Sequence, residues 1–359
     1  MYRLSVAKPV ENERPPVPTS PLSFALSVAT CVACLVAGEG AYRRSALRAA
    51  VLESEAYPIK AREYLASGGA DVVVVGSSRM YHGMVAPYLA ELAEKELGRP
   101  VKVYNLGVPA GDMNAYSLAS VDVLRAKPPK IFIFGMSPIE WTCCPTTHPS
   151  SPRWVASVRP WHGFPLLLQA VDAEEGLTDF SIAHFQSLGA RTHVLAYWKK
   201  AETPPPVYPQ GQFGWVSFGG PVDPGSQDYR AGVRTKSYRE WFYAPNHFDW
   251  NQTNHFFRAS ADRLRAAGVQ VAIIGTPQAR QMDENHRGES SYPTYVTYMQ
   301  DAAREYGSEF VNFNEFPGLS NADFADGDHL IESGARKFSR LLGERVVIPV
   351  MRGEKPKPF

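Results

Sequence analysis

The chain has 359 residues, of which 44% are hydrophobic and 20% are charged, an ordinary composition for a globular protein. Its formal net charge of +1 at pH 7 provides no basic field, so the composition argues against a nucleic-acid partner. The four cysteines show neither a disulfide framework nor the spacing of a zinc site, and we expect no metal and no cofactor.

The first element along the chain is an uncharged apolar run near the N-terminus. Residues 1–20 are rich in proline and charge, which predicts a flexible tail. Residues 21–40 approach the ~20 apolar residues that span a bilayer, so we expect a transmembrane signal-anchor helix. A cleaved signal peptide and a buried helix of a soluble protein are the alternatives. Lys and Arg are balanced on the two sides of the run, so the positive-inside rule does not orient the anchor.

Residues 41–350 are predicted to form one α/β domain. A helical stretch over 41–67 precedes five apolar strands, at 72–75, 101–106, 130–134, 269–274 and 309–313. Helical patterns follow the strands, at 87–97, 115–126, 292–306 and 332–344, with another before the fourth strand at 255–267. Strands alternating with helices predict a doubly wound, mainly parallel five-stranded sheet. In such sheets ligands bind at the carboxyl ends of the strands.

The alternation breaks between about residues 142 and 250. This region contains six tryptophans and the run Pro204-Pro205-Pro206. We interpret it as a long irregular insertion that covers the sheet edge and contains a helix near 163–173. Packing explains most of its aromatic residues, and stacking on carbohydrate is the alternative for one or two of them.

The first motif with chemical potential is Gly76-Ser77-Ser78-Arg79, directly after the first strand. A serine at a strand-to-helix turn exposes its hydroxyl close to helix-start amides, and this placement suits a nucleophile. Capping of the helix by Ser78 is the alternative. Arg79 is interpreted as a surface salt-bridge residue rather than as a binder of an anionic substrate group.

The second motif is Asp326-Gly327-Asp328-His329, just before the last helix. A carboxylate three residues before a histidine on a tight loop can hold the imidazole in one tautomer. We therefore expect Asp326 to orient His329, and Asp328 to point elsewhere or to cap the helix. A metal site is not predicted here, because no further ligand stands at a recognisable spacing. We also predict no metal site at His247, Asp249 and His255, because their spacing matches no standard ligand motif.

The third feature is the pair of loops that follow the second and third strands. Asn105 to Asp112 contains Gly107 and Gly111, and Gly135-Met136-Ser137-Pro138 follows the third strand. Small residues in such loops let backbone amides approach a substrate closely.

These motifs, in this order along the chain, resemble the SGNH (GDSL-like) hydrolase superfamily over roughly residues 71–140 and 269–344. The form Gly-Ser-Ser-Arg, the N-terminal anchor and Gly-Met-Ser-Pro resemble bacterial envelope-associated members, among them DltD-like proteins of teichoic-acid D-alanylation and related polysaccharide acyl-modifying proteins. The resemblance implies a flavodoxin-like SGNH fold, with Ser78 as nucleophile, His329 as base and Asp326 as the orienting carboxylate.

The resemblance also implies an oxyanion hole. Its donors would be the backbone N–H of Ser78 and that of Gly111 or Ala110. The usual motif supplies an asparagine side chain at the position of Ser137, so the Ser137 hydroxyl is the fourth candidate.

We therefore expect an O-acyl esterase or acyltransferase that acts on a cell-envelope polysaccharide or related polymer through an acyl-enzyme on Ser78. Water would complete hydrolysis, and a sugar hydroxyl would complete transfer. The expected partners are the acylated polymer and a membrane protein that donates acyl groups, with the domain held outside the cytoplasm by its anchor. The alternatives are a non-catalytic glycan-binding or assembly component with the same fold, and a soluble lipase-like esterase.

Overall fold

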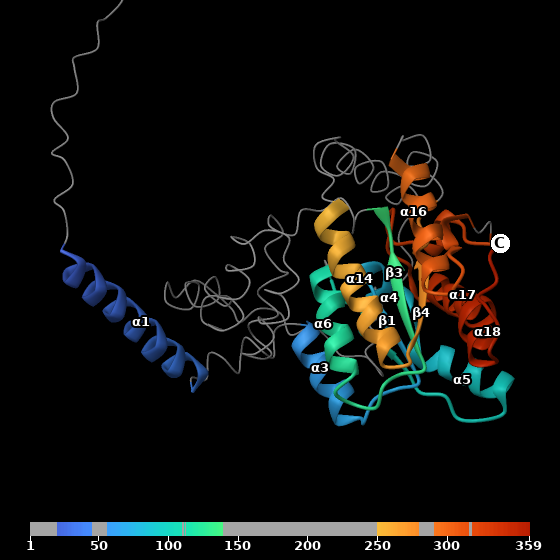
Figure 1. Cartoon of the computed structure of the whole chain (residues 1–359). Coiled ribbons are helices and arrows are strands. Elements are labelled where there is room, and N and C mark those ends of the chain that lie inside the picture. Colours follow the sequence, from blue (N-terminus) through green and yellow to red (C-terminus); the bar gives the residue numbers. More distant parts are fainter. Residues whose placement is uncertain are drawn as a thin grey trace, which may run out of the picture.

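The computed structural model describes residues 20–44, 56–109, 111, 113–138, 250–279, 291–315 and 318–359. These residues contain a five-stranded sheet in the order β2-β1-β3-β4-β5, and all four strand pairs are parallel. Figure 1 labels the three central strands, β1, β3 and β4. The strands are β1 Val72–Val75, β2 Val103–Asn105, β3 Ile131–Met136, β4 Gln270–Gly275 and β5 Val311–Asn312. The predicted parallel five-stranded α/β sheet is therefore confirmed.

The sheet has a hydrophobic core on each face because its central strands are apolar throughout. Every residue of β1 is buried, and successive side chains alternate between the two faces. Val73 lies opposite Tyr104 in β2 and Phe132 in β3, and all three belong to the first core. Val72 and Val74 belong to the second core. Burying each such side chain contributes about 1.5–3 kcal/mol.

Two sets of helices supply the outer layers (Figure 1). The first core is covered by helices that precede β1 or lie around β3 and β4: α3 Ala56–Ala66, α6 Met113–Val123, α14 Trp250–Ala266 and α16 Ser291–Glu305. The second core is covered by α5 Ala86–Leu97, α17 Glu332–Leu342 and α18 Ile348–Met351. A short helix, α4 Ser78–Gly83, follows β1 directly, and the 3-10 turns η2 Phe313–Glu315 and η3 Asn321–Asp323 follow β5.

The strand order places the end of β1 beside the point where the order of the strands reverses. The chain runs outward from β1 to β2 on one side and through β3, β4 and β5 on the other, so the order reverses between β1 and β3. At such a switch point the loops diverge and leave a crevice at the carboxyl ends of the strands. Ser78 follows β1 at this point.

The C-terminal helical region is longer than the sequence pattern predicts. Beyond α17 the chain continues through a π-helical turn, η4 Gly343–Val347, into α18. Gly343 packs closely against α5, since a Cβ on it would lie 2.7 Å from Leu92 Cδ2. Pro349 suggests a helix end, but it occupies the first turn of α18, where its missing N–H costs little.

The N-terminal apolar run forms helix α1 Pro21–Arg43, in agreement with the predicted helix. Its Leu22, Leu26 and Val36 side chains are exposed. No helix within the described ranges combines the length and the apolarity needed to cross a membrane. The signal anchor stays a prediction.

Several predicted segments lie outside the described residues. They are the tail before residue 20, residues 142–249 of the predicted insertion with its helix near 163–173, and residues 45–55 of the 41–67 stretch. The flanking parts of that stretch are helical, at 41–43 and 56–66.

Candidate active site

Three of the predicted site residues meet at one point, although Ser78 and His329 are 251 residues apart. The His329 Nε2 atom lies 2.7 Å from Ser78 Oγ. On the other side of the ring, Nδ1 lies 2.9 Å and 3.0 Å from the two carboxylate oxygens of Asp326. Serine, imidazole and carboxylate therefore form one continuous line of hydrogen bonds.

Ser78 owes its position to the short turn between β1 and α4. Ser77 is the N-cap of α4 and makes no side-chain capping bond, so the capping interpretation of Ser78 is wrong. The turn is tight because Met80 packs onto two glycines. A Cβ on Gly76 would lie 2.2 Å from Met80 Cγ, and one on Gly135 would lie 2.3 Å from the same atom. The absence of both side chains lets α4 sit against the ends of β1 and β3.

The loop that carries the histidine is held by its own carboxylate. The Asp326 Oδ1 atom accepts the backbone N–H of Asp328 at 3.0 Å and that of His329 at 2.9 Å. The N–H of Ala279, just after β4, donates to the Gly327 carbonyl at 2.9 Å. Asp326 and His329 are both buried, at 7% and 6% exposure. The carboxylate is thus fixed in place before any substrate arrives.

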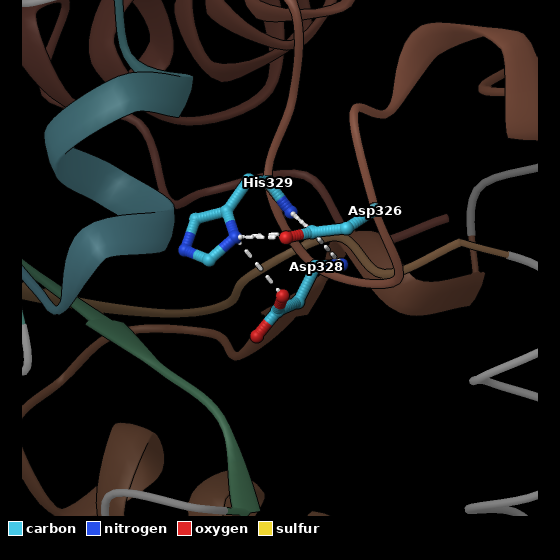
Figure 2. A group of neighbouring side chains, drawn as sticks. All are labelled: Asp326, Asp328 and His329. Atoms are coloured by element: carbon cyan, nitrogen blue, oxygen red, sulfur yellow. Dashed lines mark hydrogen bonds and ion pairs between the residues drawn. The ribbon is translucent and has the colours of Figure 1, made fainter. Parts of the chain in front are cut away.

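Asp328 is a second carboxylate on the same imidazole, and its predicted role is wrong. It does not cap α17, whose N-cap is Ile331 without a side-chain capping bond. Its Oδ1 lies 3.1 Å from His329 Nδ1, and its Oδ2 lies 3.4 Å from the Arg79 guanidinium. Figure 2 shows both carboxylates on the Nδ1 side of the ring, with the other ring nitrogen facing away from them.

Arg79 is also placed differently from its prediction. The side chains of Arg79 and Asp328 are 3% and 4% exposed, so their ion pair is buried and not a surface salt bridge. Burial makes such a pair sensitive to the loss of either member, since an uncompensated charge would remain inside the protein. One signal in the sequence could have indicated this pair: Arg79 directly follows Ser78, and Asp328 directly precedes His329.

The surroundings of His329 decide its charge. Burial by itself lowers the pKa of the imidazole, but the negative charge of Asp328 and the hydrogen bonds to Asp326 and Asp328 outweigh this. Together with the charge of Asp326 they raise the pKa of His329 from 6.5 to about 9. These groups therefore favour the imidazolium, and the population of the neutral form, whose Nε2 can act as a base, increases as the pH approaches 9.

This raised pKa predicts a pH-dependent contribution to stability. Protonated His329 stabilises the folded state, fully below the unfolded value of 6.5, and this contribution is lost as pH rises through about 9. We expect denaturant titrations at about pH 6 and about pH 10 to show a larger stability loss with pH in the wild type than in His329→Gln. Equal losses in the two proteins would contradict the raised pKa.

Three of the four predicted oxyanion donors lie among the described residues. Within the described ranges no backbone acceptor takes the N–H of Ser78, which begins α4. The N–H of Gly111 donates to the Val108 carbonyl at 3.1 Å, so that bond must open before this amide can serve an oxyanion. Ser137 is fully buried directly after β3, and Ala110 lies outside the described residues. Their roles stay predictions.

The same side chains also have the composition of a metal site. Asp326, Asp328 and His329 each place one ligand atom within 4.8 Å of the others, and no other such group occurs in the ranges that the structure describes. A cation there would bind Nδ1 and displace its proton from the hydrogen bond with Asp326. The contact between Nε2 and Ser78 Oγ is the one that a proton-carrying imidazole makes with a serine, and such a role would need the hydrogen bond to Asp326 intact.

No protein-family model matches this chain, and no curated protein matches it significantly. Function is therefore inferred from the geometry of Ser78, His329 and the two carboxylates.

Proposed function

We propose that this chain is a serine-dependent O-acyl esterase or acyltransferase of the SGNH type, acting through an acyl-enzyme on Ser78. The observation that carries the proposal is the hydrogen-bonded line from Asp326 through His329 to Ser78, with its 2.7 Å contact between Nε2 and Oγ. That contact is within the reach a general base needs to take the serine proton.

The reaction begins when Ser78 Oγ attacks the ester carbonyl and passes its proton to His329 Nε2. The resulting imidazolium is stabilised by both carboxylates, while the tetrahedral oxyanion accepts hydrogen bonds from backbone amides that include that of Ser78. The Nε2 proton then goes to the leaving alkoxide, the C–O bond breaks, and the acyl group remains as an ester on Ser78. Water or a sugar hydroxyl repeats the sequence, with His329 again as base, and restores the free serine.

Asp326 and Asp328 have different roles toward the imidazole in this mechanism. Asp326 orients the ring and fixes its tautomer, because it also accepts two backbone N–H groups of the same loop. Asp328 adds negative charge beside Nδ1, and its buried partner Arg79 lies 3.4 Å from that carboxylate on its other side.

A cell-envelope polysaccharide or related polymer is the proposed substrate, on the strength of the resemblance in motif order. The further proposal that the domain is anchored to a membrane outside the cytoplasm, where a membrane protein would supply acyl groups, comes from the same resemblance, and the apolar run that forms α1 is the segment proposed as the anchor. A non-catalytic glycan-binding component is the second candidate. The engaged N–H of Gly111 and the serine at position 137 favour it, since both weaken the oxyanion hole.

A fluorophosphonate probe tests the proposal, because it modifies only a serine that a base has activated. We expect labelling of the full chain at Ser78, located by peptide mass spectrometry, and a fall in the labelling rate of His329→Ala by about 10²–10⁴-fold. Ser78→Ala is the control for background labelling. A folded wild-type protein without label at Ser78 would contradict the esterase proposal and favour the glycan-binding candidate.

A further inference from the structure

Among the described residues, the proposed mechanism leaves a fully buried lysine, Lys60, without a role. Lys60, in the middle of α3, is 0% exposed. Its Nζ donates to the carbonyl oxygen of Asn105 at 3.0 Å and to that of Gly107 at 2.5 Å. It also lies 4.1 Å from the centre of the Tyr81 ring. Two carbonyls and one aromatic face therefore surround the Nζ atom of Lys60 and can accept its N–H groups.

The two carbonyls belong to the loop that follows β2, and this loop is bonded to the nucleophile turn. The Asn105 side chain donates to the carbonyls of Met80 at 2.8 Å and Met84 at 2.9 Å, both in or next to α4. Its Oδ1 accepts the N–H of Gly107 at 2.8 Å. One asparagine thus connects the residues that Lys60 holds to the helix that begins at Ser78.

The loop also touches the turn at its other end. The N–H of Val108 donates to the Gly76 carbonyl at 2.9 Å, two residues before Ser78. Gly107 packs on the α4 backbone so closely that a Cβ there would lie 2.8 Å from the N of Tyr81. Loop and nucleophile turn are therefore in direct backbone contact, and we expect a displacement of one to displace the other.

Burial of Lys60 at this position disfavours the charged form of its side chain. Burial lowers the pKa of Lys60 well below its usual range, and the opposing charge of Glu63 only reduces this effect. An apolar residue of similar volume would avoid the desolvation of a charge, and such replacements are often neutral for stability. What an apolar residue lacks is the ability to hold two carbonyls in fixed directions.

We propose that Lys60 is a positioning residue for Ser78, acting through the loop of Asn105 and Gly107. The inference depends on the proposed serine chemistry for its catalytic consequence. By fixing the two carbonyls and the Tyr81 ring, Lys60 keeps α4 where Ser78 Oγ meets His329. Lys60 itself touches no reacting atom.

Lys60→Met tests this role, since it keeps the length of the side chain and removes every donor. We expect the fluorophosphonate labelling rate at Ser78 to fall on the order of 10²-fold, as a misplacement of about 1 Å produces. Hydrogen exchange in peptides covering 76–84 and 103–109 should rise about tenfold, while that of β4 stays unchanged. Lys60→Gln retains donors for the carbonyls and should give intermediate values.

Tyr57→Phe is the matched control. It removes a buried polar contact of the same helix, the 2.9 Å bond to Asp122, whose partner belongs to α6 and not to the loop. Labelling of Tyr57→Phe should equal that of the wild type, whereas a fall as large as that of Lys60→Met would show a general effect of disturbing α3 and overturn the proposal.

The two proposals fail in different ways. Equal labelling of wild type and folded Lys60→Met overturns the role of Lys60 and leaves the esterase proposal intact. An unlabelled wild type would contradict the esterase proposal, and hydrogen exchange in Lys60→Met would then test the role of Lys60 by itself. Faster exchange confined to 76–84 and 103–109 would support the positioning role, and unchanged exchange would overturn it. Failure of both Lys60→Met and Lys60→Gln to fold would show a structural role only.

Discussion

Ser78→Ala is expected to lower the rate of ester hydrolysis by about 10⁶-fold, the scale seen when a serine nucleophile is removed from an intact triad. The reason is that the acyl-enzyme cannot form, while His329 and its carboxylates keep their places. The measurement is turnover of a small acetyl ester by the full chain, with the background hydrolysis of the buffer subtracted.

Ser77→Ala is the matched control for this variant. Ser77 precedes the nucleophile directly and its side chain makes no capping bond to α4, so its loss should leave turnover within a few-fold. Thermal unfolding should show both variants folded. Turnover by Ser78→Ala close to that of the wild type would contradict the assigned nucleophile, and loss of activity in Ser77→Ala alone would transfer the role to the neighbouring serine.

Asp326→Asn is expected to lower kcat by about 10⁴-fold, through the tautomer of His329. Two backbone N–H groups bind Asp326 Oδ1, and an asparagine keeps them only by presenting its carbonyl oxygen there. Its amide group then faces Nδ1, which must become an acceptor. The ring proton moves to Nε2, which can no longer take the proton of Ser78.

Asp328→Asn serves as the comparison, because it removes a charge beside Nδ1 but leaves Asp326 in place. The pKa of His329 should fall from about 9, since the charge of Asp328 is the first of the influences that raise it. Activity should therefore reach its plateau at a lower pH than in the wild type, with a plateau reduced by no more than about tenfold.

The pH profiles of the two variants decide between the carboxylates. A larger loss in Asp328→Asn than in Asp326→Asn would make Asp328 the orienting residue. An unchanged midpoint in Asp328→Asn would contradict its effect on the imidazole. Unfolding curves must accompany both profiles, since Asp328→Asn removes the charge that faces Arg79 in the interior.

Much of the fold was predictable because its signals are local. Residues 72–75 are four valines between an aspartate and a glycine, and such a short β-branched run is typical of a strand buried on both faces. The stop of α5 was also predictable, since Gly98 adopts φ of 65° at its C-cap. The short β5 was predicted too long, because pairing with β4 at only Val311 and Asn312 decides its length.

The candidate triad was predictable for a similar reason. Ser78 directly follows a strand, and Asp326 and His329 stand at a spacing that one loop can close. Parallel strands bring their carboxyl ends to one edge, so residues far apart in the chain were expected to meet there. The sequence by itself thus determined the sheet, its edge and the three residues most suited to chemistry.

Only the tertiary structure decided how those residues are supported. Arg79 and Asp328 are charged residues at 4% exposure, and nothing local predicts their burial or their pairing across 249 positions. The hydrogen bonds of Lys60 were equally unpredictable from the sequence, since they join α3 to carbonyl groups 45 and 47 residues later in the chain. Local patterns report propensity and periodicity, whereas the burial and partners of a polar side chain depend on which distant elements pack around it.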